Sequence, residues 1–116
     1  MRIVSLVPSW TEYLVDLGLE NQIVGITKFC VRPQEKVRKI QKIGGTKNLN
    51  IQKIKRLKPD LIIANIEEND RDQVEECQQF SEIILTDVRS IESALRECER
   101  IGIAVGCAER GAHWVQ

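Results

Sequence analysis

The chain has almost no histidine, because among its 116 residues only His113 is one. Nucleophilic catalysis by serine or cysteine usually relies on an imidazole base, so the rest of the chain can form no Ser-His-Asp triad and no Cys-His pair. Capture of zinc or manganese by clustered histidines is excluded for the same reason. A lone histidine near a terminus is more often structural than catalytic. We therefore expect a protein that is not an enzyme and that holds no metal ion or resident cofactor.

Net charge and long hydrophobic runs are also absent. The 17 basic residues balance 17 acidic ones, which argues against a dedicated nucleic-acid binder. No apolar run approaches the roughly 20 residues that span a bilayer, and the Met-Arg start leads directly into a strand without a secretory leader. The chain as written is therefore expected in the cytoplasm, unless a leader has been removed. With 42% hydrophobic residues it is expected to fold as one domain.

The four cysteines form no C-x-x-C pair, and their spacing fits no usual zinc site. Cys77 and Cys98 fall on the apolar faces of expected helices, which predicts buried thiols. Cys30 falls in an expected loop, and Cys107 lies near the end of the chain.

The opening segment, RIVSLVPSWTEYLVDLG, predicts a strand that runs directly into a helix. Residues 3–7 are apolar apart from Ser5, and Pro8 cannot continue a sheet ladder because it has no amide hydrogen. The pattern Ser9-x-x-Glu12 predicts a capping box, and Gly18 is expected to end the helix. In an α/β fold such a strand-to-helix turn is where ligands usually bind.

Strands are also expected at residues 22–27, 60–65 and 82–86, and helices at 51–57, at 69–79 and from Ser90 onward. Asn50 is the expected cap of the first of these helices. The pair Lys42-Ile43 is too short to predict a strand. Residues 61–64 are apolar without alternation, which is typical of a parallel strand covered on both faces. The repeated alternation predicts an α/β fold with a mostly parallel, four-stranded sheet and flanking helices.

Two polar patterns each admit a functional and a structural interpretation. Residues 44–47 (GGTK) faintly resemble a phosphate loop but lack its spacing, so a tight turn with glycines at positive φ is favoured. The acidic residues Glu67, Glu68, Asp70 and Asp72 could bind a cation. At a helix N-terminus they also complement the helix dipole, and this structural role is favoured.

With these residues in place, the chain resembles the N-terminal lobe of the solute receptors of ABC importers, whose two lobes are joined by a helical backbone. The matching segments, in order, are RIVSLVPSWTEYLVDLG, IVGITKFC, IGGTKNLNIQKIKRLKPDLIIAN and TDVRSIESALRECERIG. That family takes up vitamin B12, iron-siderophores, haem and some metal ions, and the chain most resembles its cobalamin-binding branch. The resemblance implies that residues 1–100 form one lobe of a two-lobed receptor and that residues 101–116 begin a truncated interlobe helix.

Ligands of open α/β sheets sit outside the carboxyl ends of the strands, where four loops of this chain converge. The resemblance therefore implies a binding surface for cobalamin or a related corrinoid, with an iron-siderophore or haem as the alternative. The implied ligand-binding residues are Pro8, Ser9, Trp10, Phe29, Cys30, Gly45, Thr46, Asn65 and Glu67.

Several of these residues have a second interpretation. Trp10 lies on the same helical face as Leu14, so core packing and ligand contact are both open for its side chain. Phe29 lies in a polar loop, which favours contact of its ring with a ligand or a second lobe. Cys30 could be a small buried hydrophobe or, less readily, a cobalt-ligating thiolate. The cobalamin receptors carry an aromatic residue after the third buried strand, where this chain has Asn65 and Ile66. That departure leaves siderophore or haem binding open.

The family docks onto a membrane permease through acidic side chains, for which Glu67, Glu68, Asp70 and Asp72 are candidates. The resemblance implies a periplasmic or cell-surface receptor that has a small-molecule chelate and a permease as partners. Two alternatives stay open. One is a cytoplasmic interaction or cofactor-handling protein that uses the same loops. The other is an enzyme acting through Cys30, whose thiol would need a depressed pKa.

Overall fold

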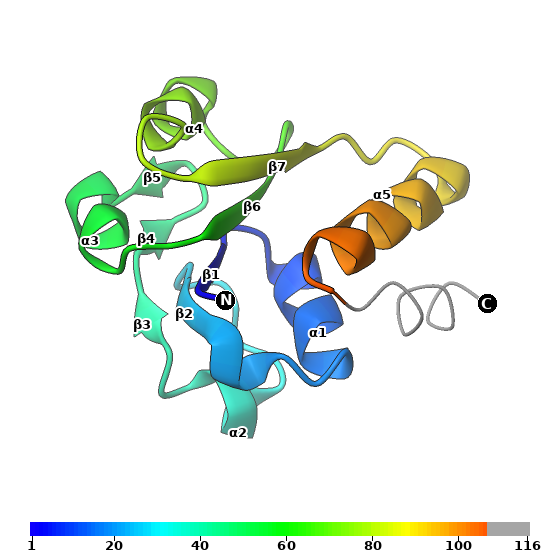
Figure 1. Cartoon of the computed structure of the whole chain (residues 1–116), viewed down its shortest axis with the longest axis horizontal. Coiled ribbons are helices and arrows are strands. Elements are labelled where there is room, and N and C mark those ends of the chain that lie inside the picture. The colour runs from blue at the N-terminus through cyan, green and yellow to red at the C-terminus, as the bar shows by residue number, and fades with distance from the viewer. Residues whose placement is uncertain (107–116) are drawn as a thin grey trace.

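A parallel sheet of five strands runs through the middle of the fold (Figure 1). The computed structural model describes residues 1–106. In spatial order the strands are β3 (Gln41–Lys42), β2 (Ile23–Ile26), β1 (Ile3–Ser5), β6 (Leu61–Asn65) and β7 (Glu82–Thr86). The predicted α/β architecture with a parallel sheet is confirmed, but the sheet has five strands where four were expected. The additional strand β3 is only two residues long, and its pairing with Gly25 and Ile26 of β2 is a tertiary contact that a local pattern does not reveal.

Helices cover both faces of the sheet. On one face lie α1 (Pro8–Asp16) and α5 (Ile91–Ala104), and on the other lie α3 (Ile51–Arg56) and α4 (Arg71–Cys77) (Figure 1). The short helices η1 (Glu20–Gln22) and α2 (Gln34–Val37) lie in the connections on either side of β2.

Each central strand contributes side chains to two separate hydrophobic cores. Ile3 of β1 packs in the core beneath α1 and α5, whereas the next residue, Val4, packs in the core beneath α3 and α4. In β6, Ile63 faces the first core and Ile62 the second. Successive side chains of a strand point to opposite faces, so an unbroken apolar run requires cover on both sides. The prediction of a doubly covered strand at residues 61–64 is confirmed.

The start of α1 differs from the prediction. The helix begins at Pro8, its N-cap is Val7, and no side chain caps it, so the capping box of Ser9 and Glu12 is wrong. Proline suits the first helical position because its missing amide hydrogen would have no partner there, and this moves the helix start ahead of Ser9. The predicted helix end is confirmed, since Gly18 follows with φ of 80°.

The cap predicted at Asn50 is confirmed, and the last helix begins where expected, with Ser90 found as its cap. The Asn50 side chain accepts a hydrogen bond from the Lys53 amide at the start of α3, and Ser90 caps α5 in a box with Ser93. The helix expected at residues 69–79 is shorter and begins at Arg71, because Asp70 is its cap.

The GGTK segment is a tight turn, as expected. Strand β4 (Gly44–Gly45) pairs antiparallel with β5 (Asn48–Leu49), so residues 46 and 47 join a short hairpin. Only Gly44 uses the positive-φ region, with φ of 108°.

Helix α5 runs across the expected lobe boundary between residues 100 and 101. Ile101 is fully buried in the core beneath α1 and α5, and the helix ends before Gly106, which has φ of 77°. Cys107, His113 and most of the expected interlobe helix lie outside the described residues. Within residues 1–106, no helix has the length and apolar character needed to cross a bilayer.

Candidate functional site

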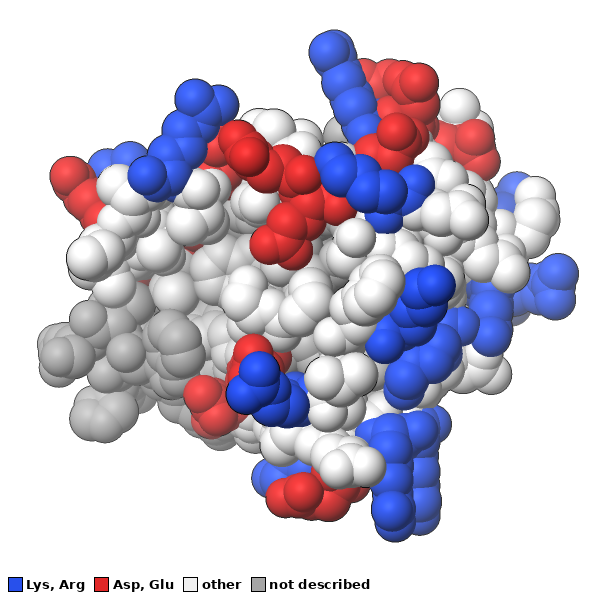
Figure 2. Space-filling view, turned by 180° about the vertical axis from the view of Figure 1, so that it is seen from behind, with Lys and Arg blue, Asp and Glu red and all other residues white. Residues whose placement is uncertain are grey.

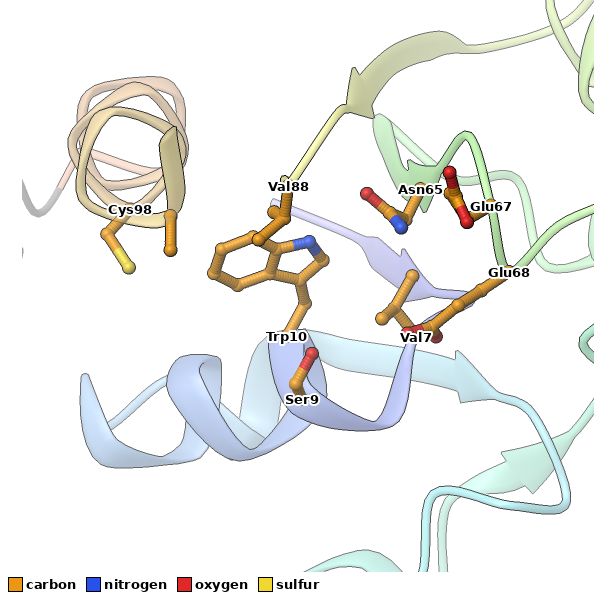
Figure 3. Close-up of a pocket in the computed structure, with 9 residues that line it drawn as sticks. Val7, Ser9, Trp10, Asn65, Glu67, Glu68, Val88 and Cys98 are labelled. Carbon is orange, nitrogen blue, oxygen red and sulfur yellow. The ribbon is translucent and has the colours of Figure 1, made fainter. Parts of the chain in front are cut away.

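A concavity of about 650 Å³ opens at the carboxyl edge of the sheet, between α1, α5 and the loops that follow β6 and β7 (Figure 3). Its walls include side chains that are far apart in the sequence. The lining residues are Val7, Ser9, Trp10, Asn65, Glu67, Glu68, Val88, Ala94 and Cys98. We call this concavity the Trp10 pocket. Its volume is in the range of small-molecule sites.

Trp10 is both a core residue and a wall of this pocket. Its side chain is 6% exposed and packs edge-on against Tyr13, with ring centroids 5.7 Å apart. The indole Nε1 donates a hydrogen bond to the Thr86 hydroxyl at 3.0 Å. Figure 3 shows the indole between Ser9 and Val88, with part of the ring directed at the cavity. Core packing of Trp10 is therefore confirmed, and because the residue also borders the open space, its contact with a ligand stays a prediction.

The side chain of Asn65 is oriented by Thr86, the same residue that accepts the hydrogen bond from Trp10. The Thr86 hydroxyl oxygen lies 2.8 Å from Asn65 Oδ1 and 2.9 Å from the Ala64 carbonyl oxygen, and its one proton can be donated to either. With Oδ1 held against Thr86, the amide nitrogen of Asn65 is the end that can donate to a ligand. Thr86 was not among the predicted site residues. Its position at the carboxyl end of a strand was the signal that could have found it.

Asn69, also missed by sequence reasoning, joins three of the edge loops. Its Oδ1 accepts from the Asn65 amide at 2.9 Å, while its Nδ2 donates to the carbonyl oxygens of Leu6 (3.1 Å) and Thr46 (3.0 Å). The residue is 3% exposed. One side chain thus ties together the ends of β1 and β6 and the turn after β4.

We expect Asn69→Ala to lower the free energy of unfolding by about 3 kcal/mol, because buried polar groups would lose partners at about 1–3 kcal/mol each. The matched control is Asn48→Ala, which removes an exposed amide that makes no side-chain hydrogen bond within residues 1–106. Urea denaturation should show a loss below about 0.5 kcal/mol for this control. Equal losses in the two variants would contradict the assigned role of Asn69.

The acidic residues have divided roles. Glu67 and Glu68 are exposed and line the Trp10 pocket, whereas Asp70 accepts from the Gln73 amide at 3.1 Å as the cap of α4, with Asp72 in its first turn. In the described part of the chain, no three His, Cys, Asp or Glu side chains gather in an arrangement that could hold a metal ion. Asp70 and Asp72 lie at the N-terminus of α4, which is the position that the helix-dipole interpretation requires.

Cationic side chains also stand close to this acidic rim. Lys47 Nζ donates to the Glu67 carbonyl oxygen at 2.8 Å. Arg89 Nε donates to Asp87 Oδ1 at 2.8 Å. That hydrogen bond, the charge of Asp87 and the more distant charge of Glu67 raise the pKa of Arg89. The rim of the pocket is therefore polar on the side of the β6 and β7 loops and apolar at Trp10 and Val88.

Phe29 and Gly45 form a second group at the same edge, outside the Trp10 pocket. Phe29 is 54% exposed, and Lys28 Nζ lies 5.3 Å from its ring centroid. A methyl group built on Gly45 would lie 3.5 Å from both side chains, so the two loops touch. Thr46 takes part through its carbonyl oxygen, which accepts from Asn69.

Cys30 is not exposed in its loop. It is 1% exposed, Thr11 Oγ1 donates to its sulfur at 3.1 Å, and Thr27 Oγ1 lies 3.2 Å away. The interpretation as a small buried residue is confirmed, and the residue lines a different concavity from the Trp10 pocket.

The expected burial of Cys77 and Cys98 is also confirmed. Burial, with a smaller contribution from Glu76, raises the pKa of Cys77 to about 11, and burial together with the charge of Glu97 raises that of Cys98. Both thiols therefore stay protonated at neutral pH. Cys98 contributes to the pocket wall as an apolar group.

Comparison with known proteins agrees with this geometry. The profile of the family described as "Periplasmic binding protein" matches residues 3–116. The uncharacterized ABC transporter substrate-binding lipoprotein YvrC of Bacillus subtilis is 34% identical over 119 residues, which covers 99% of this chain and 37% of that protein. A vitamin B12-binding protein of Vibrio vulnificus is 35% identical over 79 residues, 68% of this chain and 29% of that protein.

Solved structures share the fold. The periplasmic vitamin B12-binding protein BtuF of Vibrio cholerae superposes with a TM-score of 0.84 at 24% identity, over 98% of this chain and 46% of that chain. The periplasmic heme-binding protein RhuT of Roseiflexus sp. RS-1 gives 0.87 at 24% identity, over 98% and 44%. This chain therefore spans less than half the length of each protein compared with it here. On the strength of the profile match and the Bacillus relative, the chain belongs to the periplasmic binding protein family.

Proposed function

We propose that this chain is the N-terminal lobe of a two-lobed substrate-binding protein of an ABC importer. In this proposal the Trp10 pocket forms one wall of the cleft that holds cobalamin or a related corrinoid. The observation that carries it is the position of the pocket, at the carboxyl ends of β1, β6 and β7 with an indole in its wall. Relatives described as vitamin B12-binding proteins support the choice of ligand class.

The pocket has the chemistry to hold a large chelate without supplying a metal ligand. Trp10 and Val88 offer apolar contact to a macrocycle, and Asn65 offers an amide donor for a peripheral carbonyl or amide group. The first amides of α1 lie at the same edge and favour a polar or anionic substituent. Because one lobe covers only one side of such a ligand, it should bind more weakly than a complete two-lobed cleft.

An iron-siderophore or haem is the second candidate. The observation that favours it is the absence of an aromatic side chain after β6, where Asn65 is buried and Ile66 is 47% exposed. An amide and a carboxylate at this position suit the polar rim of an iron chelate at least as well as a corrin ring.

We also propose that Glu67 and Glu68 take part in docking to the permease. Both are exposed at the tip of the β6–α4 loop, and neither is the cap of a helix. Asp70 is engaged as the cap of α4, and Asp72 lies in its first turn, so these two are weaker candidates. Docking of this kind would place the protein in the periplasm or at the cell surface.

The test is a fluorescence titration with cyanocobalamin in a Trp114→Phe background, which leaves Trp10 as the only tryptophan. It should be run on this chain and on the longest in-frame product of its gene. We expect saturable quenching, tighter for the longer product, because bound corrin lies within energy-transfer distance of the indole. Haemin and a ferric siderophore are added as competitors, and their ability to displace cyanocobalamin measures how well the second candidate class of ligand binds.

The matched control replaces Trp10 with Phe as well, which removes the indole that lines the pocket and leaves only absorption of light by the ligand. Saturable quenching of tryptophan fluorescence by cyanocobalamin should then be lost. If none of the three ligand classes gives a saturable response in either protein, the proposed function is wrong.

A further inference from the structure

A second concavity, of about 520 Å³, lies between the loop after β2, helix α2 and strand β3. It shares no lining residue with the Trp10 pocket. Three cationic side chains border it, those of Arg32, Arg38 and Lys42, together with the apolar side chains of Val31 and Val37. Among the described residues that line it, none carries a carboxylate. We call it the basic pocket.

The two arginines have no anionic partner of their own. Within residues 1–106, neither Arg32 nor Arg38 forms an ion pair. The one nearby ion pair joins Lys36 to Glu20 at 3.4 Å, so that carboxylate is already engaged. A guanidinium group presents its donors in a planar fork that matches the oxygens of phosphate or carboxylate.

The ammonium group of Lys42 is held in place by two hydrogen bonds. It donates to the carbonyl oxygens of Val37 at 3.0 Å and Ile40 at 2.9 Å, near the end of α2. An ammonium group has three hydrogens, so one N–H is left to contact an anion. These two bonds fix the position of the charge, which lowers the entropy lost when a ligand binds.

The charge of this region stands out against a neutral chain. Residues 28–42 contain six basic residues and one acidic residue, Glu35, whereas the whole chain has a net charge of zero. Figure 2 shows that charge is unevenly distributed elsewhere on the surface too, with Lys and Arg side chains gathered on the side where Figure 1 has α3 and acidic side chains at the top and the bottom of the view. A concave site lined by charges of one sign concentrates the field and attracts the opposite charge.

From these observations we propose that the basic pocket is a second binding site, which takes a small phosphate-type oxyanion. The forks of Arg32 and Arg38 and the remaining Lys42 hydrogen contact the oxygens. The apolar side chains of Val31 and Val37 face whatever carbon skeleton the anion carries. A free phosphate ion and a phosphate ester share the chemistry that these donors recognise. This site is independent of the proposed function, because it uses none of the residues of the Trp10 pocket.

The test is an NMR titration of amide shifts at constant ionic strength, with inorganic phosphate and with phenyl phosphate. We expect saturable shifts concentrated in residues 30–42. Similar affinities would identify the free anion as the ligand, whereas several-fold tighter binding of phenyl phosphate would identify an ester with an apolar body. Shifts that rise linearly without saturation, or that spread equally over all lysines and arginines, would overturn the proposal.

A matched pair of variants separates a built site from general attraction. Arg38→Gln should weaken phosphate binding about fivefold or more, because it removes a forked contact. Lys39→Gln removes the same charge from the next residue, which does not line the pocket, and should change the affinity by less than about twofold. Equal effects would show diffuse electrostatics and would contradict the proposed site. A Trp10→Phe variant should bind phosphate like the unaltered chain, so failure of the corrinoid proposal leaves this result unchanged.

Discussion

Gly44→Ala is expected to lower the free energy of unfolding by about 3 kcal/mol or more. Gly44 has φ of 108°, a conformation that L-residues with a side chain rarely adopt. A methyl group at this position would lie 2.5 Å from the Asn48 carbonyl oxygen and 3.1 Å from the Asn50 amide nitrogen. Both are backbone atoms, which cannot rotate away, so the β4–β5 hairpin itself would have to move.

Two other glycines provide controls for this prediction. At Gly106, φ is 77° and no atom of residues 1–106 lies within 4 Å of an added methyl group, so Gly106→Ala should show mainly backbone strain, about 1 kcal/mol. At Gly45 the added methyl group makes ordinary contacts at 3.5 Å without positive φ, so Gly45→Ala should stay within about 0.5 kcal/mol. Urea denaturation of the three variants measures the differences. If Gly44→Ala lost no more stability than Gly106→Ala, the predicted steric clash at Gly44 would be wrong.

The Gly44 variant should also disturb the edge loops. The Lys28 amide donates to the Gly44 carbonyl oxygen at 2.9 Å, and the Thr46 carbonyl oxygen accepts from Asn69. A displaced hairpin therefore alters the positions of Phe29 and Asn69 together. Amide shifts of these residues should change more in this variant than in Gly45→Ala.

The second large effect is expected at Tyr13, which joins α1 to α5. Its side chain is fully buried, and its hydroxyl donates to the Cys98 carbonyl oxygen at 2.7 Å. Truncation of a buried aromatic side chain costs about 3–5 kcal/mol, because the cavity it leaves fills only partly. We expect Tyr13→Ala to lose stability in this range, whereas Tyr13→Phe, which removes only the hydroxyl, should lose about 1 kcal/mol.

Glu12→Ala is the matched control on the same helix. Glu12 is exposed and takes no part in a capping box, so its loss should change stability by less than about 0.5 kcal/mol. Chemical denaturation followed by circular dichroism measures all three variants. If Glu12→Ala cost 1 kcal/mol or more, the cap at Ser9 would have to be reinstated. If Tyr13→Phe were as damaging as Tyr13→Ala, the packing explanation would be wrong.

Tyr13→Ala should also weaken the Trp10 pocket in any molecules that stay folded. Tyr13 packs against Trp10, while Trp10 and Cys98 line the pocket from α1 and α5. Loss of the Tyr13 ring removes the side chain that fills the space between these two helices. Quenching of Trp10 by cyanocobalamin, if the proposed function holds, should therefore need higher ligand concentrations.

The sequence by itself determined the elements whose signals are local. Residues 61–64 form a buried central strand because an unbroken apolar run is stable only with cover on both faces. Asn50 and Ser90 cap helices because their side chains reach amides three residues ahead. Gly18 ends α1 because the chain needs positive φ there. Each of these signals depends only on neighbours along the chain.

Tertiary structure decided the features that depend on distant residues. Cys30 is buried because it packs into the core beneath α1 and α5, where Thr11 of α1 reaches its sulfur, although its own neighbours read as a polar loop. The two-residue strand β3 exists only through its pairing with β2. The side chains of Ser9, Trp10, Asn65 and Glu67 were predicted as ligand contacts, and folding brings them to one concavity, but their role stays a prediction.

The basic pocket and the position of Asn69 also combine a local feature of the sequence with contacts that only the fold provides. The sequence determined that residues 28–42 carry excess positive charge, but only the fold leaves Arg32 and Arg38 around a hollow without a carboxylate partner from residues 1–106. Likewise, Asn69 reads as an ordinary residue before a helix until the ends of β1, β4 and β6 meet around it. Local periodicity and caps specify elements because their energies arise within a few residues. A site requires groups from separate elements to meet, and that is decided when the elements pack.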